Sequence, residues 1–337
     1  MKRFFKVIKK VLLSLLVIIV ATVLGLTIWN QILSLREKES LEQLGQSIEV
    51  NGTSMRVYAT GEGSQTIVML SGQGTLSPII DFKPLADSLG KYYRVIVLEY
   101  LGSGLSDDTN SKRTSDNIVE EIHGALQKLN IKGQYILMPH SISGIYTMRY
   151  LQIYPQEVEA IIGIEATMPN QAKYESEVLI PNNMRVLSDV CDVVGITRLE
   201  LNISYAYLDD MYAGGYYTRE EIRQVIAICS RRSISKAQLS ENNLYHHNCE
   251  QLYNYKYPDT LPVLMILASD SCNDFNSYAK IKGYKESWSS LHEEAMSNTD
   301  IQSIVTLEGG HYLHWTQKDN LVQLITEFMK KYVTTKR

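Results

Sequence analysis

The sequence predicts an α/β protein with a mostly parallel central sheet, helices on both faces, a helical insertion and one preceding membrane-spanning helix. Short apolar runs alternate with amphipathic helical patterns along most of the chain, and the alternation is interrupted over residues 168–257. Short continuous apolar runs are typical of parallel strands that are buried on both faces. The third observation is a long uncharged run near the N-terminus.

That N-terminal region differs in kind from the rest. Residues 1–10 carry five positive charges and no acid, and residues 11–29 carry no charge at all. A run of this length is about long enough to cross a bilayer, and basic residues on its N-terminal flank favour a cytoplasmic N-terminus. We therefore expect an uncleaved signal-anchor in the cell membrane, with the rest of the chain extracytoplasmic. A cleaved signal peptide is the alternative, but no clear small-x-small site follows the run.

After the anchor, residues 30–46 are polar and favour a helix, so they predict a stalk, and residues 47–335 predict one globular domain. The strands expected in that domain are 48–58 (a hairpin turning at Asn51-Gly52), 66–70, 94–98, one beginning at Tyr135, 160–164, 262–267 and 304–307. The clearest helices are 116–130 and 319–332. Residues 168–258 are tyrosine-rich and mostly helical in pattern, which predicts a lid.

Composition limits the possible functions. The chain has 337 residues, of which 45% are hydrophobic and 21% charged, and its net charge of −4 argues against a nucleic-acid partner. Its four cysteines form no C-x-x-C pair, so neither a zinc site nor a disulfide framework is indicated. We expect no metal and no cofactor, and the sequence does not indicate an oligomeric state.

Residues 135–144 hold the most informative pattern: an apolar run, a knot of small residues, and the start of a helical pattern. A strand that passes directly into a helix makes a sharp turn, and Ser141 at its apex would have an exposed hydroxyl, as in a nucleophile elbow. The usual pattern there is G-x-S-x-G. Ser143 is small enough for the second glycine position. Pro139, at the first, is less expected because it has no N–H to donate to a central strand.

A serine nucleophile needs an imidazole base, and the imidazole needs a carboxylate that orients it. His311 is the expected base, since it follows the last strand and two glycines that let the loop turn back. His314, one turn later, is a less favoured alternative.

Three carboxylates are candidates for the orienting acid. Asp270 follows strand 262–267 and is the first choice, because it gives the order serine, aspartate, histidine along the chain. Asp274 lies in the same loop. Glu165 ends the strand after the elbow helix, and that strand end also faces the expected site, so it remains the main alternative.

An acyl-transfer site also needs two backbone N–H groups that stabilise an oxyanion. Ile142, directly after the nucleophile, is the first expected donor. Gln73 is the second, because it lies in the glycine-containing loop S-G-Q-G that follows strand 66–70.

Four segments now stand in a recognisable order: S-G-Q-G at 71–74, E-Y-L-G-S-G-L-S at 99–106, the elbow, and Gly310-His311. Over residues 47–332 the chain resembles the α/β-hydrolases, and in particular the membrane-anchored α/β-hydrolases of Gram-positive bacteria. The second segment resembles that family's D-x-x-G-x-G-x-S turn, with Glu99 in place of aspartate and expected to shape the top of the sheet.

The resemblance implies cofactor-free hydrolysis of an ester, amide or related acyl bond in a small molecule, acyl compound or short peptide, through an acyl-enzyme on Ser141. Haloalkane or epoxide chemistry on this fold would use an aspartate at the elbow, which Ser141 disfavours. The alternative from a different class is a non-catalytic binding or sensor module that kept the fold.

Overall fold

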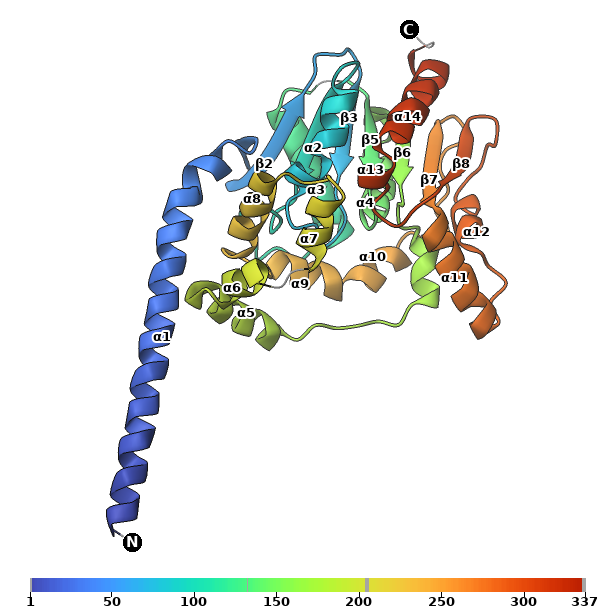
Figure 1. Cartoon of the computed structure of the whole chain (residues 1–337). Coiled ribbons are helices and arrows are strands. Elements are labelled where there is room, and N and C mark those ends of the chain that lie inside the picture. The colour runs from blue at the N-terminus through green and yellow to red at the C-terminus, as the bar shows by residue number, and fades with distance from the viewer. Residues whose placement is uncertain (1, 132, 204–205, 335–337) are drawn as a thin grey trace. The chain divides into compact units, whose positions relative to one another are not determined.

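The computed structural model describes residues 2–131, 133–203 and 206–334 (Figure 1). The chain divides into two compact units. One contains the chain through Gln43 together with Pro181–Ile234, and the other contains Leu44–Ile180 together with the chain from Ser235 onward.

The second unit is built on one eight-stranded sheet with the order β1-β2-β4-β3-β5-β6-β7-β8. Its strands are β1 (Gln46–Val50), β2 (Thr53–Thr60), β3 (Thr66–Leu70), β4 (Arg94–Glu99), β5 (Tyr135–Pro139), β6 (Val158–Ile164), β7 (Val263–Ala268) and β8 (Gln302–Leu307). β2 is antiparallel to β1 and β4, and every other pair is parallel. The predicted hairpin is confirmed: Asn51 and Gly52 have φ of 51° and 77°, the left-handed conformation that a tight two-residue turn requires.

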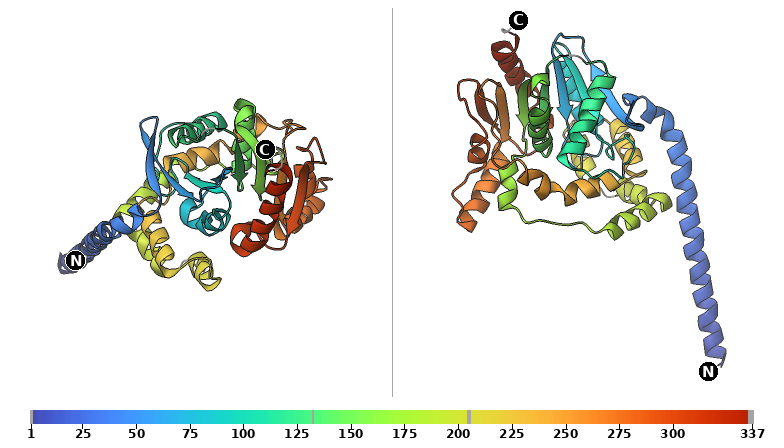
Figure 2. Two further views of the ribbon diagram at one scale, coloured as in Figure 1. Left: turned by 90° about the horizontal axis from the view of Figure 1, so that it is seen from above. Right: turned by 180° about the vertical axis from the view of Figure 1, so that it is seen from behind.

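Helices cover both faces of this sheet, as predicted (Figure 2). Successive residues of a strand point to opposite faces, so Ile67 and Met69 join one core while Val68 and Leu70 join the other. The first core includes α2 (Pro78–Leu89) and α14 (Lys318–Tyr332), and the second includes α3 (Ser115–Lys128), α4 (Ser143–Ile153) and α12 (Trp288–Glu293). The apolar runs lack polar alternation because both of their faces are buried.

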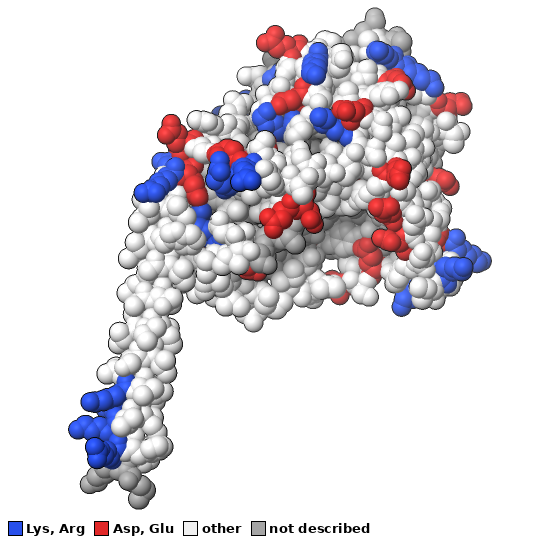
Figure 3. Space-filling view, in the orientation of Figure 1, with Lys and Arg blue, Asp and Glu red and all other residues white. Residues whose placement is uncertain are grey.

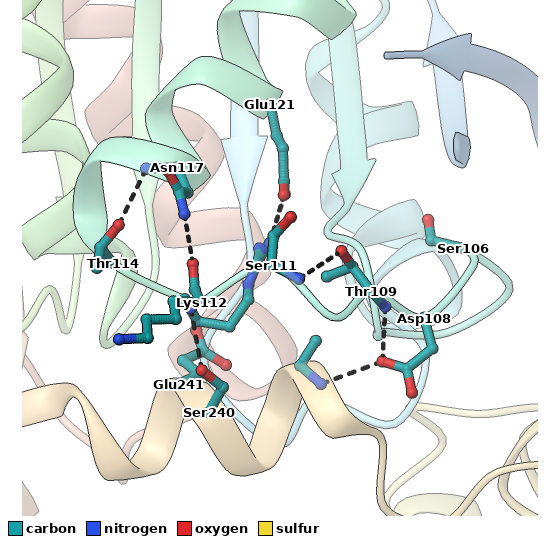
Figure 4. A network of polar contacts seen from close by, with 12 residues as sticks. Ser106, Asp108, Thr109, Ser111, Lys112, Thr114, Asn117, Glu121, Ser240 and Glu241 are labelled. Carbon is teal, nitrogen blue, oxygen red and sulfur yellow. Dashed lines mark hydrogen bonds and ion pairs between the residues drawn. The ribbon is translucent and has the colours of Figure 1, made fainter. Parts of the chain in front are cut away.

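Two helices of the predicted lid, α9 (Lys236–Asn243) and α10 (Tyr245–Glu250), belong to the same unit as the sheet. Figure 4 shows how the loop before α3 holds α9. The Asp108 carboxylate accepts the Ala237 N–H at 3.1 Å, and the Ser240 hydroxyl accepts the Arg113 N–H at 3.0 Å. The buried Arg113 guanidinium is in turn paired with Glu121 of α3 at 2.6 Å.

The other unit consists of α1 (Lys2–Glu42), α5 (Asn182–Val194), α6 (Ile196–Ile203), α7 (Ala206–Ala213) and α8 (Arg219–Cys229). The predicted anchor 11–29 and most of the predicted stalk 30–46 lie in the single helix α1, which ends at Glu42, and Gln46 already begins β1. By length and composition, α1 could cross a membrane: its most apolar window has a mean hydropathy of 2.9 and is not buried. Figure 3 shows basic side chains at its N-terminal end and an uncharged stretch beyond them.

A buried arginine fastens α6 to the C-terminal half of α1. Arg198 is 1% exposed; its Nε donates to Asn30 Oδ1 at 2.7 Å, and its two terminal nitrogens donate to the Glu37 carboxylate at 2.6 and 2.9 Å. The Asn30 amide donates to the Asp192 carbonyl of α5 at 2.8 Å. A buried charge is stable only when it is paired and hydrogen-bonded, so these contacts fix where α5 and α6 lie along α1.

Candidate active site

Ser141 occupies the sharp turn between β5 and α4. Its φ of 56° lies in the left-handed region, which costs a residue other than glycine about 1–3 kcal/mol and persists only where the surrounding structure imposes it. The Thr167 N–H donates to the Ser141 carbonyl at 2.8 Å, and the Gly144 N–H donates to it at 2.9 Å. The predicted strand, strained serine and helix are therefore present.

The two departures from G-x-S-x-G have a structural explanation. Pro139 is the last residue of β5, and the ladder continues through His140, whose N–H donates to the Leu70 carbonyl at 2.9 Å. The Ser143 hydroxyl donates to the Ser71 carbonyl and lies 2.8 Å from the Tyr100 hydroxyl, so this serine ties the elbow to the loop after β3.

The close backbone approach that requires a glycine occurs at Gly144, one residue after Ser143. A Cβ at Gly144 would lie 2.4 Å from the Thr167 carbonyl oxygen, which is closer than any real contact. A second close approach occurs at Gly72, where a Cβ would lie 2.9 Å from the Cβ of Ser141. Both glycines let neighbouring backbone reach the serine.

A cavity of 310 Å³ opens beside Ser141. Gln73 and Ile142, the two predicted oxyanion donors, line it together with the serine. Its other lining residues come from the segment after β6 and from α9 and α10, and they are mostly polar: Thr167, Gln171, Glu175, Ser176, Val178, Asn242, Tyr245 and His246.

His311 lies in the loop between β8 and α13 (Leu313–Thr316), and its partner is Glu165. His311 Nδ1 lies 3.2 Å from Glu165 Oε2; the histidine side chain is 40% exposed, and the glutamate side chain is fully buried. Within the described residues, no hydrogen bond joins His311 to Ser141.

Glu165 follows β6 and is held as an anion. Its φ is 49°, and its carboxylate accepts the Ala268 N–H at 2.6 Å and the Ser271 hydroxyl at 2.5 Å besides facing His311. Burial acts to raise the pKa of this carboxyl. The hydrogen bonds from His311, Ser271 and Ala268 outweigh that effect and lower the pKa below 4.5.

The structure does not bring Asp270, the first predicted acid, to His311. Asp270 is exposed in the first turn of α11 (Ser269–Lys282), and within the described residues no hydrogen bond joins it to the histidine. Because the helix begins directly after β7, residue 270 already turns outward, while its N–H donates to the Gly309 carbonyl at 3.1 Å. Asp274 is exposed further along the same helix. The second candidate, Glu165, is the one in contact.

Two other histidines support the loop that carries His311. His140 Nε2 donates to the His311 carbonyl at 3.1 Å. Burial, with His314 and His311 close by, lowers the pKa of His140 well below 6.5, so it remains a neutral donor. The buried His314, the less favoured candidate for the base, is bonded to Asp81 at 3.1 Å and stacks on Phe82.

Sequence reasoning missed the contributions of His140 and Ser271. Neither residue belongs to a motif that assigns it a role: His140 directly precedes the nucleophile, and Ser271 lies near the start of α11. Glu99 behaves as expected: it is buried at the sheet top and accepts the Leu105 N–H at 2.7 Å. Within the described residues, no group of three His, Cys, Asp or Glu side chains could hold a metal ion.

The sheet order, the strained serine and the pairing of His311 with a buried carboxylate are those of an α/β-hydrolase, and the chain belongs to that family of enzymes. Residues 65–187 match the family described as alpha/beta hydrolase fold. The chain is also 30% identical, over 98% of its own length and 99% of the other protein's, to the uncharacterized protein YbdG of Bacillus subtilis (strain 168).

Solved structures share the fold at lower identity. The Cif epoxide hydrolase from Acinetobacter nosocomialis is 16% identical with a TM-score of 0.66, covering 90% of this chain and 96% of that one. An esterase from Thermogutta terrifontis is 16% identical with a TM-score of 0.58, covering 86% of this chain and all (100%) of that one. These likenesses concern the fold alone.

Proposed function

We propose that this α/β-hydrolase is a serine hydrolase that cleaves an ester, amide or related acyl bond through an acyl-enzyme on Ser141. The observation that carries the proposal is the buried Glu165 hydrogen-bonded to Nδ1 of His311, on the same sheet as the strained Ser141. A serine at the elbow favours acyl transfer over the epoxide chemistry of the Acinetobacter neighbour, and an esterase is among the fold neighbours.

The chemistry follows from which atoms hold protons. Glu165, an anion, accepts the Nδ1–H of His311 and leaves Nε2 as the basic nitrogen. Nε2 takes the proton of the Ser141 hydroxyl as its oxygen attacks the acyl carbon, and the resulting imidazolium is stabilised by Glu165. The same proton then passes to the departing alcohol or amine. Water, deprotonated by His311, attacks the acyl-enzyme and releases the acid and the free serine.

The oxyanion of each tetrahedral intermediate would bind the backbone N–H groups of Gln73 and Ile142. Both residues line the cavity at Ser141, and Ile142 caps the N-terminus of α4, where the helix dipole favours negative charge. Each such donor contributes about 10²–10³ in kcat. Gly72 supports this assignment because it lets the Gln73 backbone come close to the serine.

The membrane arrangement is also part of the proposal. The uncharged run 11–29 of α1 would cross the bilayer, the basic residues 2–10 would lie in the cytoplasm, and the remainder would be extracytoplasmic. The polar contacts of Asn30 and Glu37 favour a position for them beyond the hydrocarbon core.

A fluorescent fluorophosphonate tests the nucleophile. The full chain in detergent is the appropriate sample, because residues of α1 hold Arg198. We expect an adduct at Ser141, found by mass spectrometry, that is absent in Ser141→Ala and at least tenfold slower in His311→Ala. Ser176→Ala, which alters an exposed serine of the same cavity, should label normally.

A folded wild-type chain that takes no label would reject the hydrolase proposal. It would favour the non-catalytic binding module in its place.

A further inference from the structure

Helices α5 and α6 each expose a row of apolar side chains to solvent. On α5 the residues 186, 190 and 193 follow the i, i+4, i+7 spacing of one helix face, and on α6 the residues 196, 199 and 203 follow the i, i+3, i+7 spacing. The exposed large side chains are Met184, Val186, Leu187, Val190, Val193, Ile196, Leu199 and Ile203. A patch of this kind marks a surface that contacts something apolar.

The contacts with α1 determine where along its axis this apolar face lies. Gly195, which ends α5, packs against the Leu26 carbonyl and Asn30, where a Cβ at residue 195 would lie 3.2 Å and 2.8 Å from their nearest atoms. Both lie at the C-terminal end of the uncharged run 11–29. In Figures 1 and 2, α5 and α6 lie beside α1 well before its C-terminal end.

We infer that the apolar face of α5 and α6 is immersed in the outer leaflet of the bilayer, at the boundary between acyl chains and headgroups. The inference rests on the proposed membrane insertion of α1. If residues 11–29 fill the hydrocarbon core, the helices fastened at Leu26 and Asn30 are held at its outer surface. Amphipathic helices in that plane bury their apolar side in lipid.

The charges of these helices are compatible with that position. Arg185 and Asp189 form an ion pair at 2.6 Å on α5, and the Asp192 carboxylate accepts the Ser233 N–H at 2.8 Å. Glu200 is exposed on α6, where headgroups and water can solvate it. The Arg198 contacts with Asn30 and Glu37 prevent α6 from moving away from this level.

Lipid is favoured over a second copy of the chain as the occupant. The helix α1, to which α5 and α6 are fastened, also exposes large apolar side chains from Val11 to Ile28. Lipid must cover that part of α1 in any inserted state. By contrast, α8 meets α1 at Ser40, about 15 Å further along the axis than Asn30, so α8 should remain in water.

Tryptophan quenching by lipids brominated on their acyl chains tests the depth. The full chain with Trp29→Phe is reconstituted in such vesicles, and Leu187→Trp is compared with Arg223→Trp, which alters an exposed side chain of α8. We expect quenching of about half of the emission added at position 187 and almost none at position 223. The unsubstituted chain, with Trp29 at the boundary, reports whether α1 itself is inserted.

Quenching of Trp29 without quenching at position 187 would overturn the inference and leave the anchor intact. Absence of quenching both for Trp29 and at position 187 would reject the anchor as well. A tryptophan at position 187 that is not quenched by the brominated lipids, but whose emission wavelength shifts as the protein is diluted in the vesicles, would assign the face to a second copy. None of these results depends on the activity of Ser141.

Discussion

The ends of β6 and β7 are neighbours in the sheet, and an acidic residue follows each of them, yet the two residues have opposite surroundings. Glu165 leaves β6 in a left-handed conformation, is fully buried and accepts three hydrogen bonds. Asp270 leaves β7 into a helix and is exposed. The backbone path after each strand thus decides which carboxylate reaches His311, and the order of residues along the chain does not.

Exchanging each carboxylate for its amide tests this difference most strongly. Glu165→Gln should lower kcat/KM by about 10³–10⁴, because the amide cannot stabilise the imidazolium and favours the wrong tautomer of His311. Asp270→Asn should change kcat/KM by less than about threefold. Both are measured by the rate of fluorophosphonate labelling and by hydrolysis of an activated ester. The reverse pattern would restore Asp270 as the acid.

Glu99 is buried like Glu165 but does not face a histidine, so it shows the effect of burial on a carboxylate without that partner. Burial raises the pKa of Glu99 to about 7, and the hydrogen bonds from Leu105, Ile79 and Ser77 offset only part of that. Between pH 4.5 and 7 the folded chain keeps a proton that the unfolded chain releases. The free energy of unfolding should therefore fall by up to about 3 kcal/mol across this window as pH rises.

Glu99→Gln removes the titrating group and should lack this loss, so its stability relative to wild type should rise between pH 5 and pH 8. Urea unfolding of the full chain in detergent at the two pH values measures the change. Glu62→Gln, at an exposed site, should follow wild type. Parallel pH profiles of wild type and Glu99→Gln would contradict the prediction.

Removing one hydrogen bond from Glu165 should have a smaller effect. Ser271→Ala deletes the hydroxyl that donates to Glu165 Oε2, and hydrogen bonds to charged groups contribute about 1.5–3 kcal/mol, so we expect a loss of roughly tenfold or more in kcat/KM. The lowered pKa of Glu165 stabilises the fold above pH 4.5, and this contribution is lost as pH falls through the folded pKa. The variant should therefore begin to unfold at a higher pH in acid titrations.

Ser277→Ala, on the exposed side of the same helix, is the matched control. Equal activity and acid stability in Ser271→Ala and Ser277→Ala would show that the Ser271 hydroxyl does not support Glu165.

The smallest expected effect concerns Asp270 itself. Its carboxylate lies in the first turn of α11, where negative charge is favoured by the helix dipole. Asp270→Asn should lower the free energy of unfolding by about 0.5 kcal/mol at low salt, with no loss of activity. Thermal unfolding at low and high salt measures it, since added salt should screen the difference. A large loss of stability would mean that Asp270 has a structural partner beyond this turn.

The sequence carried enough local information to predict the sheet and the elbow. Strand 66–70 coincides with β3 and helix 116–130 differs from α3 by two residues at most, because both patterns are set by neighbouring residues. The elbow at Ser141 was predictable without either usual glycine, since the passage from strand to helix marks the turn.

The contact between Glu165 and His311 and the division of the insertion were not predictable in the same way. The Glu165 carboxylate is held by the Ala268 N–H at the end of β7 and by the Ser271 hydroxyl, both more than 95 residues away in sequence. The lid predicted at 168–258 is divided between the two units at Ile180 and Ser235. The middle part, residues 181–234, joins α1 through Arg198, whose partner Asn30 lies 168 residues earlier. No local pattern encodes contacts of that range.

The elbow also determines which positions of this chain can vary. Two residues where relatives of this fold usually carry glycine are here a proline and a serine, and the serine makes a contact that glycine could not make. The position that does not tolerate a side chain is instead Gly144. A Cβ there would meet the Thr167 backbone, which cannot move aside as a flexible side chain could. A library of substitutions across 139–144 should therefore recover Ser143 variants more often than any variant of Gly144.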